Sequence, residues 1–184
     1  MKKSDINQPP CYFDKYINCV ADVELFEAFK QSQLELEQLD LEKLDHIGEA
    51  VYAEGKWTIK DIIQHLIDAE RVMAYRALRI GRNDQTELPG FDQDLLAANV
   101  NTRRRSLKCL MDELTLLRKT TVQLFESFDE VALHRYTVIN GNQMSALAYG
   151  FAIPGHQKYH LTLIEEKYLP LLASSRVVII PESL

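Results

Sequence analysis

Two of the five histidines in the chain, His156 and His160, stand four positions apart near its end. Side chains at this spacing project from one face of a helix, so the two imidazoles can bind one metal ion together. On a helical wheel of about 100° per residue, both histidines fall on the apolar side with Tyr149, Ile153 and Leu163. An unpartnered imidazole there would be costly. Spacing alone leaves a metal site and simple packing in the core as open alternatives.

A third imidazole comes from an earlier helix, predicted from Thr58 to Ile80. Thr58 followed three residues later by Asp61 resembles a capping box, which starts a helix. His65 then lies at the edge of an apolar stripe, and the small Ala69 one turn further leaves space beside the ring. Three imidazoles from two facing helices could hold Zn²⁺, Ni²⁺ or Mn²⁺ with one position open. The residues alone leave open whether His65 joins the pair.

Three segments resemble motifs of the DinB/YfiT-like superfamily. The signature W-[ST]-x-x-[DE]-[IL]-x-x-H-[LI]-x-D-x-E is matched within residues 56–70, KWTIKDIIQHLIDAE. Residues 154–160, PGHQKYH, resemble the G-H-x-x-x-H motif of the last helix of that superfamily. Residues 88–94, LPGFDQD, resemble the loop before its third helix. The resemblance covers nearly the whole chain, with the motifs in the expected order.

The resemblance implies an all-α protein, a DinB/YfiT-like four-helix bundle with up-down-down-up helix directions. It also implies a divalent metal ion at one end of the bundle, with His65, His156 and His160 as its ligands. The superfamily contains thiol-cofactor S-transferases, a thiol-dependent isomerase and many proteins of unknown activity. It therefore implies the metal site more firmly than the reaction.

Two carboxylates, Asp61 and Glu70, are candidates for supporting a ligand histidine by hydrogen bonding. Asp61 stands one turn before His65, but capping of the helix explains it equally well. Glu70 falls in the middle of the apolar stripe, where a carboxylate needs a partner. If the second and third helices were antiparallel neighbours, Arg103 would lie opposite Glu70, and we favour this structural ion pair. Parallel helices would leave Glu70 to support a histidine.

Three other segments carry apolar residues at helical spacing, 21–46, 96–128 and 145–168. Ser145 is the expected N-cap of the last helix, and Pro170 ends it. Together with the helix that carries His65, these segments predict four long amphipathic helices. Such a pattern is typical of a four-helix bundle.

The remaining segments are expected to connect or flank these helices. Residues 81–92 read as a loop, and residues 136–139 as an extended piece followed by a turn. Residues 1–10 are expected to be a loose N-terminal arm. Residues 171–184 form a C-terminal tail, whose apolar run is too short to found a sheet.

The composition describes one domain over residues 1–184, with a net charge of −6. This acidic balance argues against nucleic-acid binding and against a polybasic membrane anchor. We expect no membrane span, no signal peptide and, with three cysteines lacking CxxC spacing, a reducing cytoplasm. The arginines of the helix that carries His65, Arg71, Arg76 and Arg79, are expected to be solvated or salt-bridged.

These features favour a metal-dependent enzyme with a small-molecule substrate. An ion with an open position lowers the pKa of a bound water or thiol, which becomes the nucleophile for hydrolysis or S-transfer. A low-molecular-weight thiol would then be a second cofactor. A non-catalytic metal-binding protein is one alternative, although structural zinc usually has four protein ligands. A stress-related helical interaction protein with packed histidines is the other, and the apolar faces could support a homodimer.

Overall fold

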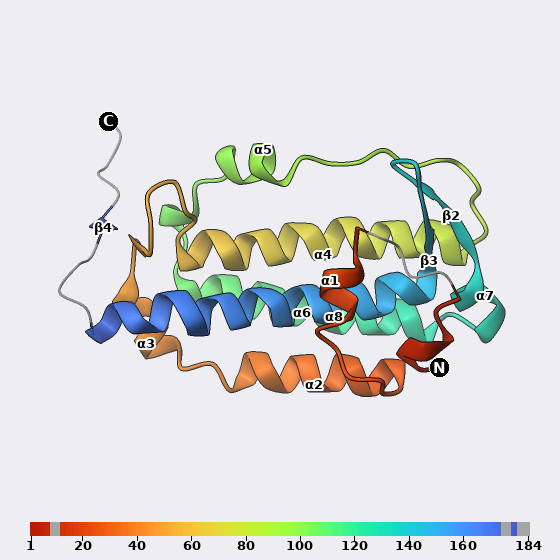
Figure 1. The fold of residues 1–184 in the computed structure, drawn as a ribbon, viewed down its shortest axis with the longest axis horizontal. Helices are drawn as coiled ribbons and strands as arrows, with labels where there is room; N and C mark the ends of the chain where they lie inside the picture. The colour runs from red at the N-terminus through yellow and green to blue at the C-terminus, as the bar shows by residue number, and fades with distance from the viewer. Residues whose placement is uncertain (8–11, 174–177, 180–184) are drawn as a thin grey trace.

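The computed structural model describes residues 1–7, 12–173 and 178–179, and four long helices dominate it (Figure 1). They are α2 (Leu25–Glu37), α4 (Ile59–Gly81), α6 (Leu107–Glu126) and α8 (Ala146–Leu163). In Figure 1, α2 and α8 run in one direction and α4 and α6 in the other. The all-α four-helix bundle with up-down-down-up directions is therefore confirmed.

Shorter elements complete the described chain. The helical ones are η1 (Lys3–Asp5), α1 (Asp14–Ile17), α3 (Leu41–Ile47), α5 (Gln93–Ala98), η2 (Thr102–Arg104), α7 (Glu130–His134), the π-helical η3 (Ile164–Tyr168) and η4 (Leu169–Ala173). The strands are β1 (Ala50–Val51), β2 (Tyr136–Ile139), β3 (Asn142–Ser145) and β4 (Val178–Ile179).

Capping residues begin the helices that carry the histidines. The Thr58 hydroxyl accepts a hydrogen bond from the Asp61 backbone N–H at 3.2 Å, and the Asp61 carboxylate accepts from the Thr58 N–H at 2.9 Å. This reciprocal pair is the predicted capping box. Ser145 caps α8 as predicted, accepting from the Ala148 N–H at 3.0 Å. Helical structure continues from α8 through η3 to Tyr168, the predicted end.

Two predicted helices are shorter than the apolar spacing suggested. The predicted helix 21–46 is two helices, because Asp40 accepts from the Lys43 N–H at 3.1 Å and starts α3 anew. The predicted helix 96–128 begins only at Leu107, after its N-cap Ser106. In both cases a polar side chain bonds the backbone and interrupts the helix, while the apolar spacing runs on across the break.

The two ends of the chain also differ from expectation. The first residues are not a loose arm, because the Met1 amino group bonds Glu24 at 2.5 Å and the Ser4 N–H bonds Asp22 at 2.9 Å. Residues 8–10 of the predicted arm lie outside the described residues. In the tail, β4 pairs antiparallel with β1, so this short run does form a two-stranded sheet.

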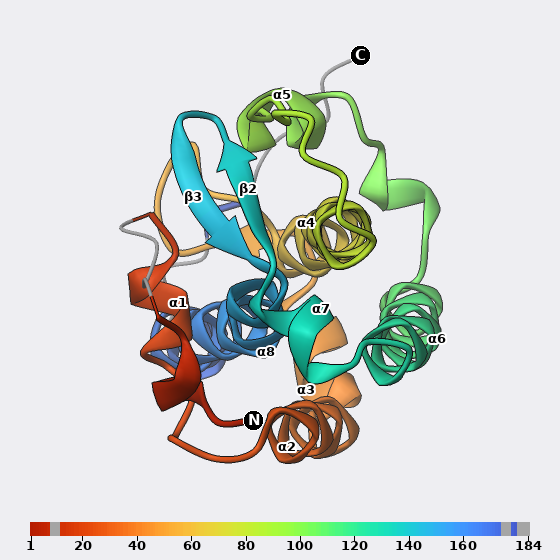
Figure 2. The same ribbon diagram turned by 90° about the vertical axis from the view of Figure 1, so that its right-hand side faces the viewer.

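A long crossover, residues 82–106, connects α4 to α6. Because these neighbours run parallel, the crossover must return along the bundle, and it does so along the outer side of α4 (Figures 1 and 2). It is held near its start by the hairpin of β2 and β3, since the Leu88 N–H bonds the Val138 carbonyl at 3.1 Å. Nearer its end, the Thr102 hydroxyl donates to Asp61 at 2.5 Å.

A buried ion pair joins the parallel helices α4 and α6. Arg118 donates to Glu70 through Nε at 3.0 Å and through Nη2 at 2.9 Å, and their side chains are only 1% and 3% exposed. The predicted partner, Arg103, is wrong, because that pairing required antiparallel helices. Arg103 instead pairs with Glu49 near the surface at 3.3 Å.

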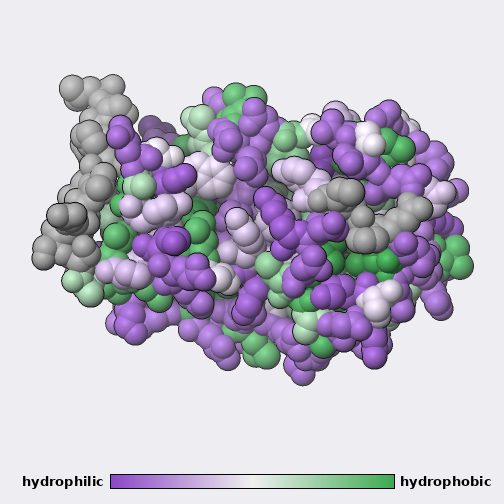
Figure 3. Space-filling view, viewed as in Figure 1, coloured by the Kyte–Doolittle hydropathy of each residue, from purple (hydrophilic) through white to green (hydrophobic). Residues whose placement is uncertain are grey.

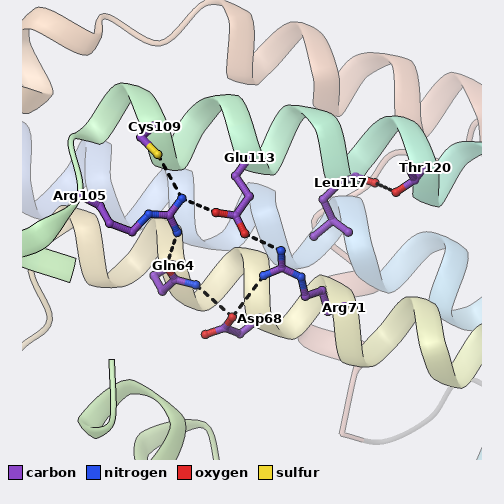
Figure 4. A network of polar contacts seen from close by, with 8 residues as sticks. All are labelled: Gln64, Asp68, Arg71, Arg105, Cys109, Glu113, Leu117 and Thr120. Carbon is purple, nitrogen blue, oxygen red and sulfur yellow. Dashed lines mark hydrogen bonds and ion pairs between the residues drawn. The ribbon is translucent and has the colours of Figure 1, made fainter. Parts of the chain in front are cut away.

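A second polar network links α4 and α6 on their outer side (Figure 4). Arg105 donates to Gln64 at 2.9 Å, and Gln64 donates to Asp68 at 3.0 Å. Glu113 accepts hydrogen bonds from both Arg105 and Arg71. Partly exposed pairs of this kind contribute little energy each, but together they fix how the two helices lie along one another.

Replacing Glu70 by glutamine is expected to lower the free energy of unfolding by about 3–5 kcal/mol, because it leaves the Arg118 charge buried and unpaired. Urea denaturation measures this. The control is Arg103→Met, which removes only a surface pair and should cost about 1 kcal/mol or less. Equal costs for the two variants would contradict the buried pair.

Candidate metal centre

Three imidazoles meet between α4 and α8. His65, His156 and His160 are 6%, 4% and 7% exposed. The Nε2 atom of His156 lies 3.0 Å from Nε2 of His65 and 3.1 Å from Nε2 of His160. The structure thus brings together all three predicted ligands, and it turns the same ring nitrogen of each toward the others.

The spacing of these nitrogen atoms fits one shared ion. Imidazole nitrogen binds zinc at about 2.0–2.1 Å, which places two nitrogens on one ion about 3.0–3.4 Å apart at common coordination angles. A neutral imidazole has one donor and one acceptor nitrogen, so three Nε2 atoms facing one another cannot satisfy each other by hydrogen bonds alone. One cation can receive all three lone pairs. The donor set therefore suits a divalent ion such as Zn²⁺ or Ni²⁺.

The protonation state of the cluster supports the same chemistry. Burial lowers the pKa of His65 to about 4 and that of His160 to about 3. Burial, with the two neighbouring imidazoles, also lowers the pKa of His156 well below its ordinary value. All three rings are neutral at pH 7, and the neutral imidazole is the form that binds metals.

The two carboxylates predicted to support a histidine have other partners in the described structure. Asp61 bonds Thr58 through one oxygen and Thr102 through the other. Glu70 bonds Arg118 through both oxygens. Asp61 therefore caps α4 and holds the crossover, while Glu70 serves the structural role that we favoured.

The resemblance placed the metal at one end of the bundle, and the histidines lie elsewhere. One apolar core cluster contains the buried residues of α4 up to Ile67, and a second contains those from Ala69 onward. On α8, the buried apolar residues up to Ile153 belong to the second cluster, and Leu161 belongs to the first. The histidines occupy the layer between the two clusters, inside the bundle.

Two aromatic rings pack against the histidines, a contact that the sequence analysis did not predict. The Trp57 ring lies 4.9 Å from the His65 ring, and the Tyr16 ring lies 4.7 Å from the His156 ring, both between centroids. Tyr16 belongs to α1, which crosses α8 (Figure 1). A Cβ atom on Gly155 would lie 2.0 Å from the Tyr16 carbonyl oxygen. A glycine within an apolar helix was the available signal of this close approach.

A cavity opens beside the cluster. It has a volume of about 160 Å³, and both His65 and His156 line it. Its walls come from α1, α4, the crossover and the β2–β3 hairpin, with Tyr16, Met73 and Phe91 among the lining residues. A small ligand in this cavity would contact the imidazoles directly.

In the part of the chain that the structure describes, no second group of three or more His, Cys, Asp or Glu side chains could hold a metal ion. Figure 3 shows the face that carries α1 and α8 as mostly hydrophilic, with apolar residues in small groups. Among the described residues, no helix is both long enough and apolar enough to cross a membrane.

The fold and the site together define a four-helix-bundle protein with a buried three-histidine cluster. The sequence profile of the DinB superfamily matches residues 24–164, and the chain belongs to that superfamily.

Two known proteins are similar to this chain. One is a relative from Oceanobacillus iheyensis named as a "putative metal-dependent hydrolase", which is 28% identical over 123 residues. That match covers 62% of this chain and 66% of the relative, just under two thirds of its length. The other is the solved structure of YfiT from Bacillus subtilis, described as a probable metal-dependent hydrolase with an unusual four-helix bundle topology. It has a TM-score of 0.57 and 17% identity, covering 83% of this chain and 85% of that one, and shows the shared fold.

Replacing Gly155 by alanine is expected to push α1 away from α8 and lower the free energy of unfolding by about 1–3 kcal/mol, because the new methyl group meets backbone. Urea denaturation measures the loss. The control is Lys158→Ala, an exposed position on the same helix. A Gly155→Ala protein as stable as that control would contradict the close contact.

Proposed function

We propose that this protein is a metal-dependent hydrolase whose divalent ion is held by Nε2 of His65, His156 and His160. The observation that carries this proposal is the convergence of three buried, neutral imidazole nitrogens beside a cavity that His65 and His156 line. Three protein ligands leave a coordination position for a reactant, as in catalytic zinc sites. The names of the two similar proteins support the same reaction class.

The chain's own residues would hold and shield such a centre. When bound, a divalent ion supplies Lewis-acid chemistry, which lowers the pKa of a water or thiol and polarises a carbonyl or phosphoryl oxygen. Trp57 and Tyr16 pack on the ligand rings and limit their rotation. Met73 and Met144 contribute apolar wall to the cavity, which keeps the centre poorly hydrated.

The substrate in this proposal is a small molecule, since the cavity beside the imidazoles has a volume of about 160 Å³, the scale of a small ligand. A low-molecular-weight thiol could take the same open position as water, which would make the protein an S-transferase. The two reactions share the metal centre and differ in the second reactant.

Purified without a polyhistidine tag, the protein is expected to contain about one divalent ion per chain by mass spectrometry. The His156→Ala/His160→Ala double variant should lose the ion because it removes two of three ligands. The His160→Gln variant removes one ligand but keeps a side chain of similar volume, and it should bind the ion more weakly. His46→Ala is the matched control, since this histidine is exposed and outside the cluster.

The loaded protein is then assayed with ester, amide and phosphate-ester substrates, with and without added thiol. Hydrolysis that is lost in the double variant supports the proposal. Turnover only with thiol would replace the hydrolase by the S-transferase. A wild-type protein that stays metal-free after reconstitution with Zn²⁺, Ni²⁺ and Mn²⁺ would contradict both.

A further inference from the structure

Arg76 is a buried cation that lines the same cavity as His65 and His156. Its side chain was expected to be solvated or salt-bridged, but the residue is only 5% exposed. Its Nη2 donates to the Pro89 carbonyl at 2.6 Å, and its Nη1 lies 3.5 Å from the Tyr149 hydroxyl. Within residues 1–7, 12–173 and 178–179, no carboxylate forms an ion pair with Arg76. Burying a charge without a counter-ion costs desolvation free energy that no ion pair offsets.

Arg118 is a second buried arginine, and its role is structural because it has a carboxylate partner. Both oxygens of Glu70 accept hydrogen bonds from it, and the Ser32 hydroxyl accepts another. The partners of Arg76 are neutral by contrast. Burial raises the pKa of Tyr149 to about 12, so its hydroxyl stays protonated and cannot act as the counter-ion.

Holding the crossover does not account for a charge at this position. The bond to the Pro89 carbonyl needs one N–H donor, and a neutral donor can satisfy a neutral carbonyl. The Phe91 ring lies 5.3 Å from the guanidinium carbon and offsets part of the cost of the charge. The rest of the guanidinium remains available to a ligand in the cavity.

Arg76 and the histidine cluster lie at different positions along α4, so one elongated ligand could contact both. His65, Ala69, Met73 and Arg76 follow one face of the helix, and all four line the cavity. Eleven residues correspond to about 16 Å along the axis. Helical side chains lean toward the N-terminus, so the guanidinium leans back toward His65. The α4 side of the cavity thus has an imidazole near one end, the apolar Ala69 and Met73 between, and a cation near the other.

We propose that Arg76 binds a carboxylate group of the substrate, and that a short apolar segment joins this carboxylate to the group that reacts at the histidine cluster. The identity of the reacting end rests on the proposed function. The carboxylate site itself does not require the metal ion. A guanidinium presents paired donors that match a carboxylate in two parallel hydrogen bonds.

The test uses the full chain labelled with ¹³C at the methionine methyl groups, which gives four NMR signals. Met73 and Met144 line the cavity, whereas Met111 packs in the other core cluster and serves as an internal control. Butanoate and the isosteric neutral butanamide are titrated into metal-free and Zn²⁺-loaded protein. Butanoate is expected to shift the Met73 and Met144 signals in both forms, and butanamide should bind at least about tenfold more weakly.

Three variants separate the charge from the contact with the crossover. Arg76→Gln removes the charge and keeps an amide N–H donor on a shorter side chain, so butanoate binding to the metal-free protein should fall at least about tenfold. Arg76→Lys keeps the charge and should retain binding within about fivefold. Arg79→Gln is the matched control, since this arginine pairs with Asp84 outside the cavity, and it should bind as the wild type does.

The inference is overturned if butanamide binds as tightly as butanoate, or if the Arg76→Gln variant binds butanoate as the wild type does. Absence of any shift of Met73 and Met144 with butanoate would overturn it as well. An unchanged Met111 signal shows that each variant is folded. Zinc content is measured on the same samples, so a failed carboxylate site with full zinc is distinguished from failure of the metal centre.

Discussion

The parallel contact between α4 and α6 is the constraint on which the rest of the structure depends. The buried Glu70–Arg118 pair holds these helices together at mid-length, and the surface network around Glu113 aligns them. Parallel neighbours cannot be joined by a tight turn, so residues 82–106 must return along the bundle. That return places the crossover over α4, where it supplies one wall of the cavity beside the histidines.

The histidine cluster depends equally on how α8 packs. It runs antiparallel to α4 (Figure 1). This packing brings His156 and His160 together with His65. Gly155 allows the backbone of α1 to approach α8 directly, and this contact seats Tyr16 against His156. The site thus lies in a polar layer between two apolar clusters, where packing on both sides limits movement of the rings.

The sequence predicts best what helical geometry determines locally. The Thr58–Asp61 capping box and the inward face of His156 and His160 follow from spacing alone, and both are confirmed as structure. The helix directions came from the resemblance, and no local signal carries them. For that reason the partner of Glu70 was predicted wrongly, and Arg76 could not be recognised as buried, since its burial comes from the distant crossover. Which ion the histidines bind, the homodimer and the cytoplasmic location stay predictions.

Because a loop supplies the wall of the cavity around Phe91, that wall carries little of the bundle's packing. Insertions and substitutions in surface loops cost far less stability than changes in helix cores. A gene encoding this fold can therefore vary its crossover and leave the imidazole cluster intact. Divergence within the superfamily would then change which molecules are accepted sooner than it changes the chemistry performed on them.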